Sequence, residues 1–206
     1  MRSRAAMSFV VLFVFAAVVS SAELVDRIVA IIDRDVVMLS EAERAEALLK
    51  IRGADPGSLA DVVERMIESH LIEKEVARFT DEPVPEDRVQ EALAKVRARF
   101  GNEEAYRAAL AVRGIPEREV SIELERQLEV SRYLERRFRA LTYVSDEEID
   151  QYFEQKVLPG LDAERGPTVE EIDQIRRILE EQKFSDRVDR WIEGLKERAG
   201  IRRYVW

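Results

Sequence analysis

The sequence predicts a mostly α-helical fold with a small β-hairpin near its N-terminus, which a C-terminal strand could complete. Three observations predict this fold. Apolar residues recur at spacings of three and four along most of the 206-residue chain, which is the period of an amphipathic helix. Three patterns of the type Ser/Thr-x-x-Glu, which can cap helix N-termini, precede predicted helices. β-branched residues concentrate in two short runs between residues 24 and 39, ahead of the first predicted helix.

The first 22 residues have the pattern of a secretory signal. Two arginines precede an apolar run at 7–19, and small residues at 20–22 suit a signal peptidase. We therefore expect export and cleavage after Ala22, with no stable membrane insertion afterwards. The alternative is a retained anchor, because the uncharged stretch 5–22 approaches the about 20 apolar residues of a membrane-spanning helix. The strongly apolar part is shorter than that, which favours cleavage.

Charge and cysteine content exclude several classes of function. The chain carries 33 basic and 42 acidic side chains, a net charge of −9. Loss of residues 1–22 removes two arginines and no acid, which leaves 31 basic and 42 acidic groups and a net charge of −11. So acidic a surface argues against nucleic-acid binding, which needs a basic footprint. The absence of cysteine excludes disulfides, thiol catalysis, cysteine metal sites and a lipoprotein anchor.

Helices are expected along the rest of the chain, and each has an identifiable start. The apolar runs 24–32 and 36–39 flank a polar break and predict the hairpin. The longest helix, with an apolar stripe from Val120 to Leu141, should cover about 25 residues. The predicted helices begin at Ser40 (with Glu43), Ser58, Pro85, Asn102, Pro116, Ser145 (with Glu148), Thr168 (with Glu171) and Ser185.

The predicted organisation is an N-terminal helical domain, a linker and a C-terminal part. The linker is 158–167, which holds two glycines and two prolines. It separates an N-terminal domain, 23–157, from C-terminal helices and a strand at 168–206. We expect this C-terminal part to pack back onto the N-terminal domain.

The sequence predicts no catalytic, cofactor-binding or metal-ligating residues. His70, the single histidine, lies at the edge of an apolar stripe without a nucleophile context, so a structural role is expected. One histidine and no cysteine leave no transition-metal cluster. The acidic run 146–148 begins a helix, where negative charge stabilises the helix dipole.

Four stretches in order resemble the SurA-type periplasmic chaperones. They are VDRIVAIIDRDVVMLSEAE (25–43), ERMIESHLIEKEVA (64–77), FGNEEAYRAALAVRGIPEREVSIELERQL (100–128) and KFSDRVDRWIEGLKERAGIRRYV (183–205). The first three resemble the N-terminal domain of that family, and the fourth resembles the C-terminal helix and strand that complete it. Family members usually carry parvulin prolyl-isomerase domains between these parts, whereas this chain offers only 158–167. The resemblance therefore implies a multi-helix chaperone module without the isomerase.

The resemblance implies an ATP-independent periplasmic chaperone that holds unfolded exported proteins, with outer-membrane protein precursors as its expected partners. The alternative is a structural or adaptor subunit that binds one folded envelope partner through the same apolar faces. The range of proteins bound distinguishes the two hypotheses, because a chaperone binds many unfolded chains, whereas an adaptor binds one native partner. Residues expected to contact a bound peptide, although core packing is the commoner role of such residues, are Val89, Leu93, Val96, Phe100, Tyr143, Tyr152 and Phe153.

Overall fold

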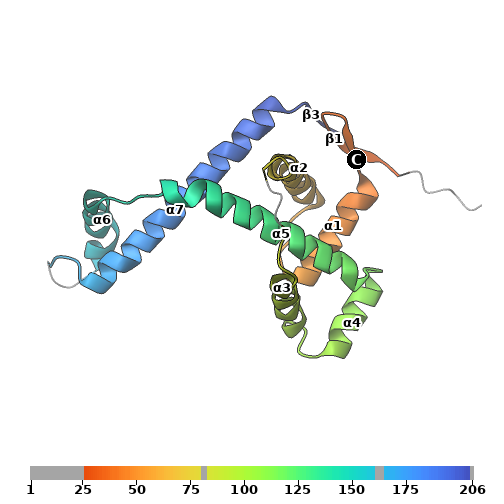
Figure 1. Ribbon diagram of the computed structural model, residues 1–206, viewed down its shortest axis with the longest axis horizontal. Coiled ribbons are helices and arrows are strands. Elements are labelled where there is room, and N and C mark those ends of the chain that lie inside the picture. Colours follow the sequence, from red (N-terminus) through yellow and green to blue (C-terminus); the bar gives the residue numbers. More distant parts are fainter. Residues whose placement is uncertain (1–25, 80–82, 161–164, 205–206) are drawn as a thin grey trace, which may run out of the picture.

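The computed structural model describes residues 26–79, 83–160 and 165–204. The described chain is mostly helical and carries a small three-stranded antiparallel sheet, which confirms the predicted fold class (Figure 1). The expected signal segment, 1–22, lies outside the described residues. Among the helices that are described, none combines the length and the apolar character needed to cross a membrane.

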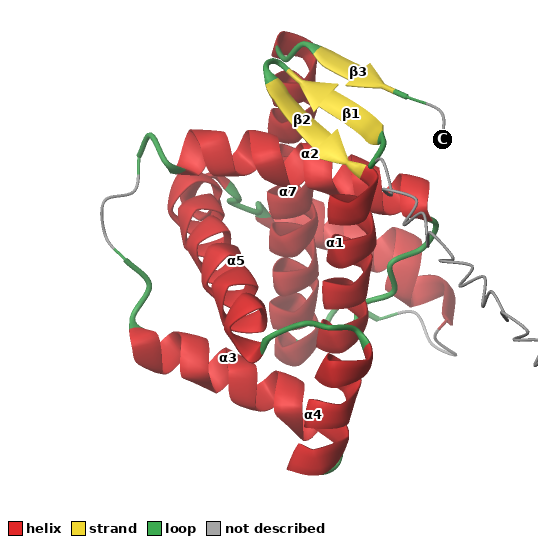
Figure 2. Cartoon of the chain, turned by 90° about the vertical axis from the view of Figure 1, so that its right-hand side faces the viewer, coloured by secondary structure: helices red, strands yellow, loops and turns green. Residues whose placement is uncertain are grey.

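The sheet joins the two ends of the chain. Strands β1 (Ile28–Ile32) and β2 (Asp35–Met38) form the predicted hairpin, and β3 (Ile201–Arg203) pairs with the other edge of β1. The order is therefore β2-β1-β3, visible at the top of Figure 2. Asp33 in the hairpin turn adopts a left-handed backbone, with φ of 56°. Its carboxylate accepts hydrogen bonds from the Gly200 N–H and from Lys74 Nζ, each at 2.9 Å, so the turn is fixed to the start of β3.

Seven α-helices occupy the described residues, and their starts follow ordinary capping chemistry. The Ser58 hydroxyl accepts the Asp61 N–H, and the Asn102 side chain accepts the Ala105 N–H, as the sequence predicted. The capping boxes at Ser145 and Thr168 also form. The helices are α1 (Leu39–Arg52), α2 (Leu59–Val76), α3 (Glu86–Ala98), α4 (Glu103–Val112), α5 (Glu117–Phe138), α6 (Asp146–Tyr152) and α7 (Val169–Arg198).

Two predicted helix starts are wrong. Ser40 does not cap α1, because the helix begins one residue earlier and the Ser40 N–H and hydroxyl both donate to the Asp26 carboxylate. The Glu41 carboxylate instead accepts the Met38 N–H at 2.8 Å. Ser185 begins no helix, because α7 runs unbroken for 30 residues through this position. A serine in a helix interior can be accommodated when its side chain faces solvent, as that of Ser185 does.

Helix α7 connects two lobes, and Figure 1 shows it crossing α5 between them. The main lobe contains the sheet, α1–α5 and the C-terminal half of α7. The core around the sheet includes Val29, Ile67 and Tyr133, and Leu195 of α7 is buried within it. A second core in the same lobe joins α1, α3, α4 and α5 around Tyr106. The site described below lies within the main lobe, along α2.

The tip lobe is formed by α6, two short helical turns and the N-terminal half of α7. The turns are η2 (Phe153–Val157), a π-helical segment, and η3 (Leu158–Gly160). Its small core is built from Val144, Ile149, Phe153 and Ile175. The first three residues of the predicted linker are thus helical, and Leu158 packs partly against this core.

Candidate functional site

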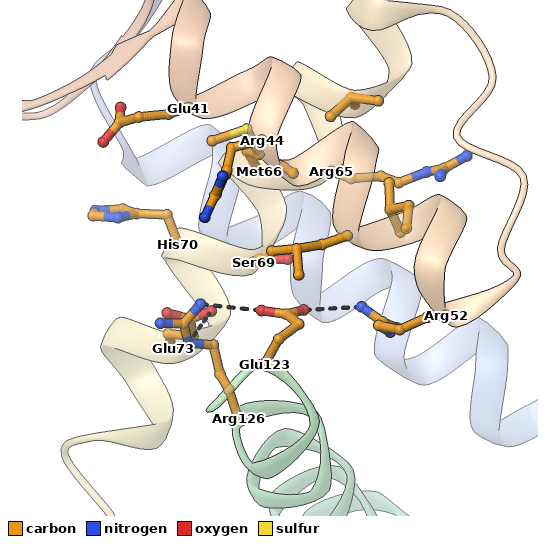
Figure 3. Close-up of a pocket in the computed structure, with 14 residues that line it drawn as sticks. Glu41, Arg44, Arg52, Arg65, Met66, Ser69, His70, Glu73, Glu123 and Arg126 are labelled. Carbon is orange, nitrogen blue, oxygen red and sulfur yellow. Dashed lines mark hydrogen bonds and ion pairs between the residues drawn. The ribbon is translucent and has the colours of Figure 1, made fainter. Parts of the chain in front are cut away.

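Two hollows lie along α2, between α1 on one side and α5 on the other. The first hollow has a volume of about 320 Å³, and Figure 3 shows the side chains around it. Its apolar lining comes from α1 and α2, because both helices turn aliphatic residues toward each other. These apolar lining residues are Ala45, Leu48, Leu49, Val62 and Met66.

The second hollow has a volume of about 240 Å³ and lies between α2 and α5. Its apolar lining consists of Ile72 from α2 and of Val130 and Leu134 from α5. The two hollows share four lining residues, Ser69, Glu73, Glu123 and Arg126. We call the two hollows together the α2 groove. The partition consists of the three charged residues that both hollows share, together with Arg52, which pairs with Glu123.

The partition is a chain of ion pairs that crosses the α2 groove (Figure 3). Arg52 Nη1 lies 3.0 Å from Glu123 Oε1, and Arg126 Nη1 lies 3.2 Å from Glu123 Oε2. Arg126 Nε lies 3.3 Å from Glu73 Oε1. Two guanidinium groups therefore balance two carboxylates, and the partition has no net charge although the chain carries −9.

Burial shifts the pKa values of the residues at the two ends of the partition, Glu73 and Arg52. Burial raises the pKa of Glu73, and the neighbouring Glu123 and Glu129 raise it further, against the opposing effect of Arg126. Burial lowers the pKa of Arg52, and the Glu123 carboxylate offsets part of this shift. Arg126 is the most open member, with its side chain 47% exposed. The partition therefore presents Arg126, Glu73 and the exposed Ser69 hydroxyl to a ligand.

The rim of the groove is polar. Arg44 of α1 donates to both carboxylate oxygens of Glu119, at 2.7 and 2.5 Å, and to the Gly114 carbonyl at 2.9 Å. His70 Nε2 lies 3.0 Å from Asp35 Oδ2 without hydrogen-bond geometry. No serine or cysteine nucleophile is paired with His70, and the described residues contain no group of three His, Cys, Asp or Glu side chains that could hold a metal. This arrangement can bind apolar side chains between fixed charges.

The structure does not bring the seven predicted peptide-binding residues together. Val89, Leu93 and Val96 are buried in the main lobe, and Phe100 is half-buried beside them. Val89 and Leu93 form the floor of another hollow, about 360 Å³, between α3 and α5.

The remaining three predicted residues belong to the tip lobe. Phe153 is buried and Tyr152 is half-buried in its core, whereas Tyr143 is 80% exposed. In this arrangement Phe153 supports the fold, and of the seven residues Tyr143 is the one freely open to a peptide.

Sequence reasoning did not select the residues of the α2 groove. In the sequence, Met66 and Ile72 are two of the many apolar residues of the helix predicted to begin at Ser58, and nothing local distinguishes them from core residues. The sequence pattern behind the groove is a set of aliphatic residues on α1 together with charged residues on α5. To recognise it, one must know that α1 and α5 lie on either side of α2.

Comparison with curated proteins finds two similar chaperones. The chain is 30% identical over 149 residues to the chaperone SurA of Pseudomonas putida. The aligned region covers 66% of the chain and 34% of the relative. The chain is also 28% identical over 154 residues to the chaperone SurA of Pseudomonas fluorescens. This aligned region covers 68% of the chain and 35% of that relative. This similarity supports a SurA-like relationship at the level of the family. No protein-family model matches the chain.

The SurA-like relationship concerns only a part of each relative, because the chain spans about a third of their length. The matched share of the chain, about two thirds, exceeds what the sheet or any single helix contains. The similarity therefore extends over several of the elements that form the two lobes.

Proposed function

We propose that the chain is an ATP-independent periplasmic chaperone that holds unfolded exported proteins, in particular precursors of outer-membrane proteins. The observation that carries this proposal is the similarity to two proteins named as chaperones. The α2 groove is compatible with it, because two open, mostly apolar hollows can each hold a client side chain. The strands of barrel precursors expose apolar faces until they insert, so such clients need holding in water.

The proposed mechanism is weak binding of apolar segments without chemistry. A client side chain that enters a hollow loses contact with water, which favours binding at roughly 25 cal/mol per Å² of apolar surface. The client backbone loses conformational freedom at the same time, which keeps each contact weak and reversible. The similarity to chaperones favours a non-catalytic protein.

The direct test is light scattering of a urea-unfolded outer-membrane protein after dilution, with and without the chain. We expect stoichiometric amounts to slow aggregation without ATP, with an affinity near micromolar, about −8 kcal/mol. A folded protein of similar size serves as the control and should remain unbound. Failure to slow aggregation at tenfold excess would refute the proposed chaperone function.

Periplasmic location is a further part of the proposal, and it rests on the signal pattern at 1–22. Intact mass of the exported protein should correspond to a chain beginning at Glu23. A full-length species recovered in the membrane fraction would instead favour the retained anchor.

The adaptor alternative has one observation in its favour. Ile28 and Val36 of the hairpin are 42% and 45% exposed, so the small sheet offers an apolar patch that a folded partner could cover. An adaptor would bind one native envelope protein and leave unfolded clients to aggregate.

A further inference from the structure

The α2 groove has a geometry that selects among clients. We propose that it binds a single extended segment carrying two apolar side chains about three residues apart, one in each hollow, with the residues between them lying over the partition. This inference rests on the proposed chaperone function and names the class of segment that the site would take.

The division of the groove favours an extended segment over a helix. An α-helix with its side chains is about 10–12 Å across. The ion pairs of the partition cross the groove between the two hollows, so a helix of this width would have to remain above them with little of its surface buried. Single side chains of an extended segment can enter the two hollows separately.

The spacing of the hollows sets the spacing of the side chains. Met66 in the first hollow and Ile72 in the second are six residues apart on α2, roughly 9 Å along the helix axis. An extended chain of the polyproline II type, which is common in unfolded proteins, advances about 3.1 Å per residue and has three residues per turn. Side chains three residues apart therefore lie on the same side of it, roughly 9 Å apart. Adjacent apolar residues would place both side chains in one hollow or leave one in water.

The partition favours polar groups between the two apolar side chains. Arg126 can donate to a client carbonyl, and Glu73 can accept a client N–H, because both side chains are partly exposed. Ser69 is exposed and borders both hollows, so its hydroxyl can do either. An unfolded segment has unpaired backbone groups that can form hydrogen bonds at this point. An apolar side chain placed here would remove the charges from water without forming a hydrogen bond, which disfavours binding.

Matched serine substitutions test the site without disturbing the core. Ser69→Arg would fill both hollows at the partition, and Ser131→Arg would fill the second hollow only, because Ser131 lines that hollow alone. Ser185→Arg is the control, an exposed serine in the interior of α7. All three serines are exposed on helices, so the variants should melt within about 2 °C of the parent.

The probes are two uncharged nine-residue peptides of serine, glutamine and two leucines, with blocked ends and identical composition. The leucines are three positions apart in the spaced peptide and adjacent in the clustered peptide. Binding to the full chain is followed by amide chemical shifts, which report weak affinities. The spaced peptide should bind roughly tenfold more tightly, because it buries a second leucine.

The variants should separate the two hollows. Ser69→Arg should weaken binding of the spaced peptide roughly tenfold or more. Ser131→Arg should reduce the affinity of the spaced peptide to that of the clustered peptide. Ser185→Arg should leave both affinities within about twofold of the parent value. Equal affinities of the two peptides, binding of neither peptide, or a spaced peptide insensitive to Ser69→Arg would each overturn the inference. If the parent still slows aggregation in that case, the chaperone function stands and only this site is wrong; a parent that binds the spaced peptide but slows no aggregation refutes the function instead.

Discussion

At the scale of single residues, the partition keeps ionised groups partly out of water beside apolar side chains. Such burial has a cost unless each charge is paired, and the pairing here is shared among two carboxylates and two guanidinium groups. At Glu73 the cost is not fully offset, because burial and the acidic neighbours Glu123 and Glu129 raise its pKa against the opposing effects of Arg126 and His70. The fold therefore carries a local electrostatic cost at this position that a neutral residue would avoid.

We predict that Glu73→Gln raises the melting temperature at pH 7 by up to about 2 °C. The pKa of Glu73 is raised in the folded state, so the folded protein holds this proton more strongly than the unfolded chain does. The carboxylate therefore destabilises the fold above the folded-state pKa, and the effect disappears below the unfolded-state pKa, at about pH 4. Thermal melts of both proteins at pH 7 and near pH 4 provide the measurement. A lower melting temperature for Glu73→Gln at pH 7 would mean that the ion pair with Arg126 outweighs the cost of burial.

At the scale of elements, α7 and β3 complete the main lobe. Leu195 is 6% exposed in the core around the sheet, and Trp191, Ile192 and Ile201 pack against that core. Trp191 also contacts the rings of Tyr133 and Phe138 on α5, with centroids 5.8 and 5.6 Å apart. The hairpin alone would be marginal in water, so it depends on this cover.

Removal of residues 184–206 should therefore lower the melting temperature sharply or make the chain insoluble. Each fully buried large apolar side chain contributes about 1.5–3 kcal/mol, and losing several approaches the about 5–15 kcal/mol of a whole domain. Leu195→Ala is the milder test and should cost about 2–5 kcal/mol. Val169→Ala is the control, since Val169 lies on the same helix and is 71% exposed. A truncated chain that melts like the parent would show that the two ends fold independently.

The elements were more predictable from the sequence than the site. Hairpin, third strand and most helix starts follow from local chemistry, such as the hydroxyl of Ser58 or the side-chain oxygen of Asn102. The predicted helix start at Ser185 is wrong because a serine followed by charged residues and then by an apolar stripe resembles a cap even within a helix, and only the packing along α7 distinguishes the two cases. The α2 groove could not be predicted, because it depends on how α1 and α5 lie relative to α2, and apolar stripes do not distinguish a buried Leu93 from a half-buried Met66.

At the scale of the whole molecule, we predict no prolyl isomerase activity. The resemblance places isomerase domains between the two parts of the chaperone module, where this chain has only residues 158–167. Uncatalysed isomerisation takes tens to hundreds of seconds, so acceleration would be easy to detect. A proline-containing peptide assayed with micromolar chain should isomerise at the uncatalysed rate, with a known isomerase as the positive control. Measurable catalysis would require a proline-binding site that the resemblance does not account for.

Client binding should respond to salt according to the charge of the client, because the chain as a whole is acidic while the partition is neutral. The net charge of −9 attracts basic segments from a distance, whereas Arg52 and Arg126 balance Glu73 and Glu123 inside the groove. Salt screens the first effect, since the Debye length falls from about 10 Å at 0.1 M to 3 Å at 1 M, and it leaves apolar burial intact.

We therefore expect the affinity for an uncharged leucine peptide to change by less than about twofold between 0.05 and 0.5 M NaCl. The same peptide extended by two lysines should bind several-fold more weakly at the higher concentration, because its attraction to the acidic surface is screened. Titration of both peptides at the two salt concentrations measures the difference. Because the peptides share the same leucines, only the added charge can produce it. If the uncharged peptide no longer bound at high salt, the charged helix faces, and not the apolar hollows, would be the binding surface.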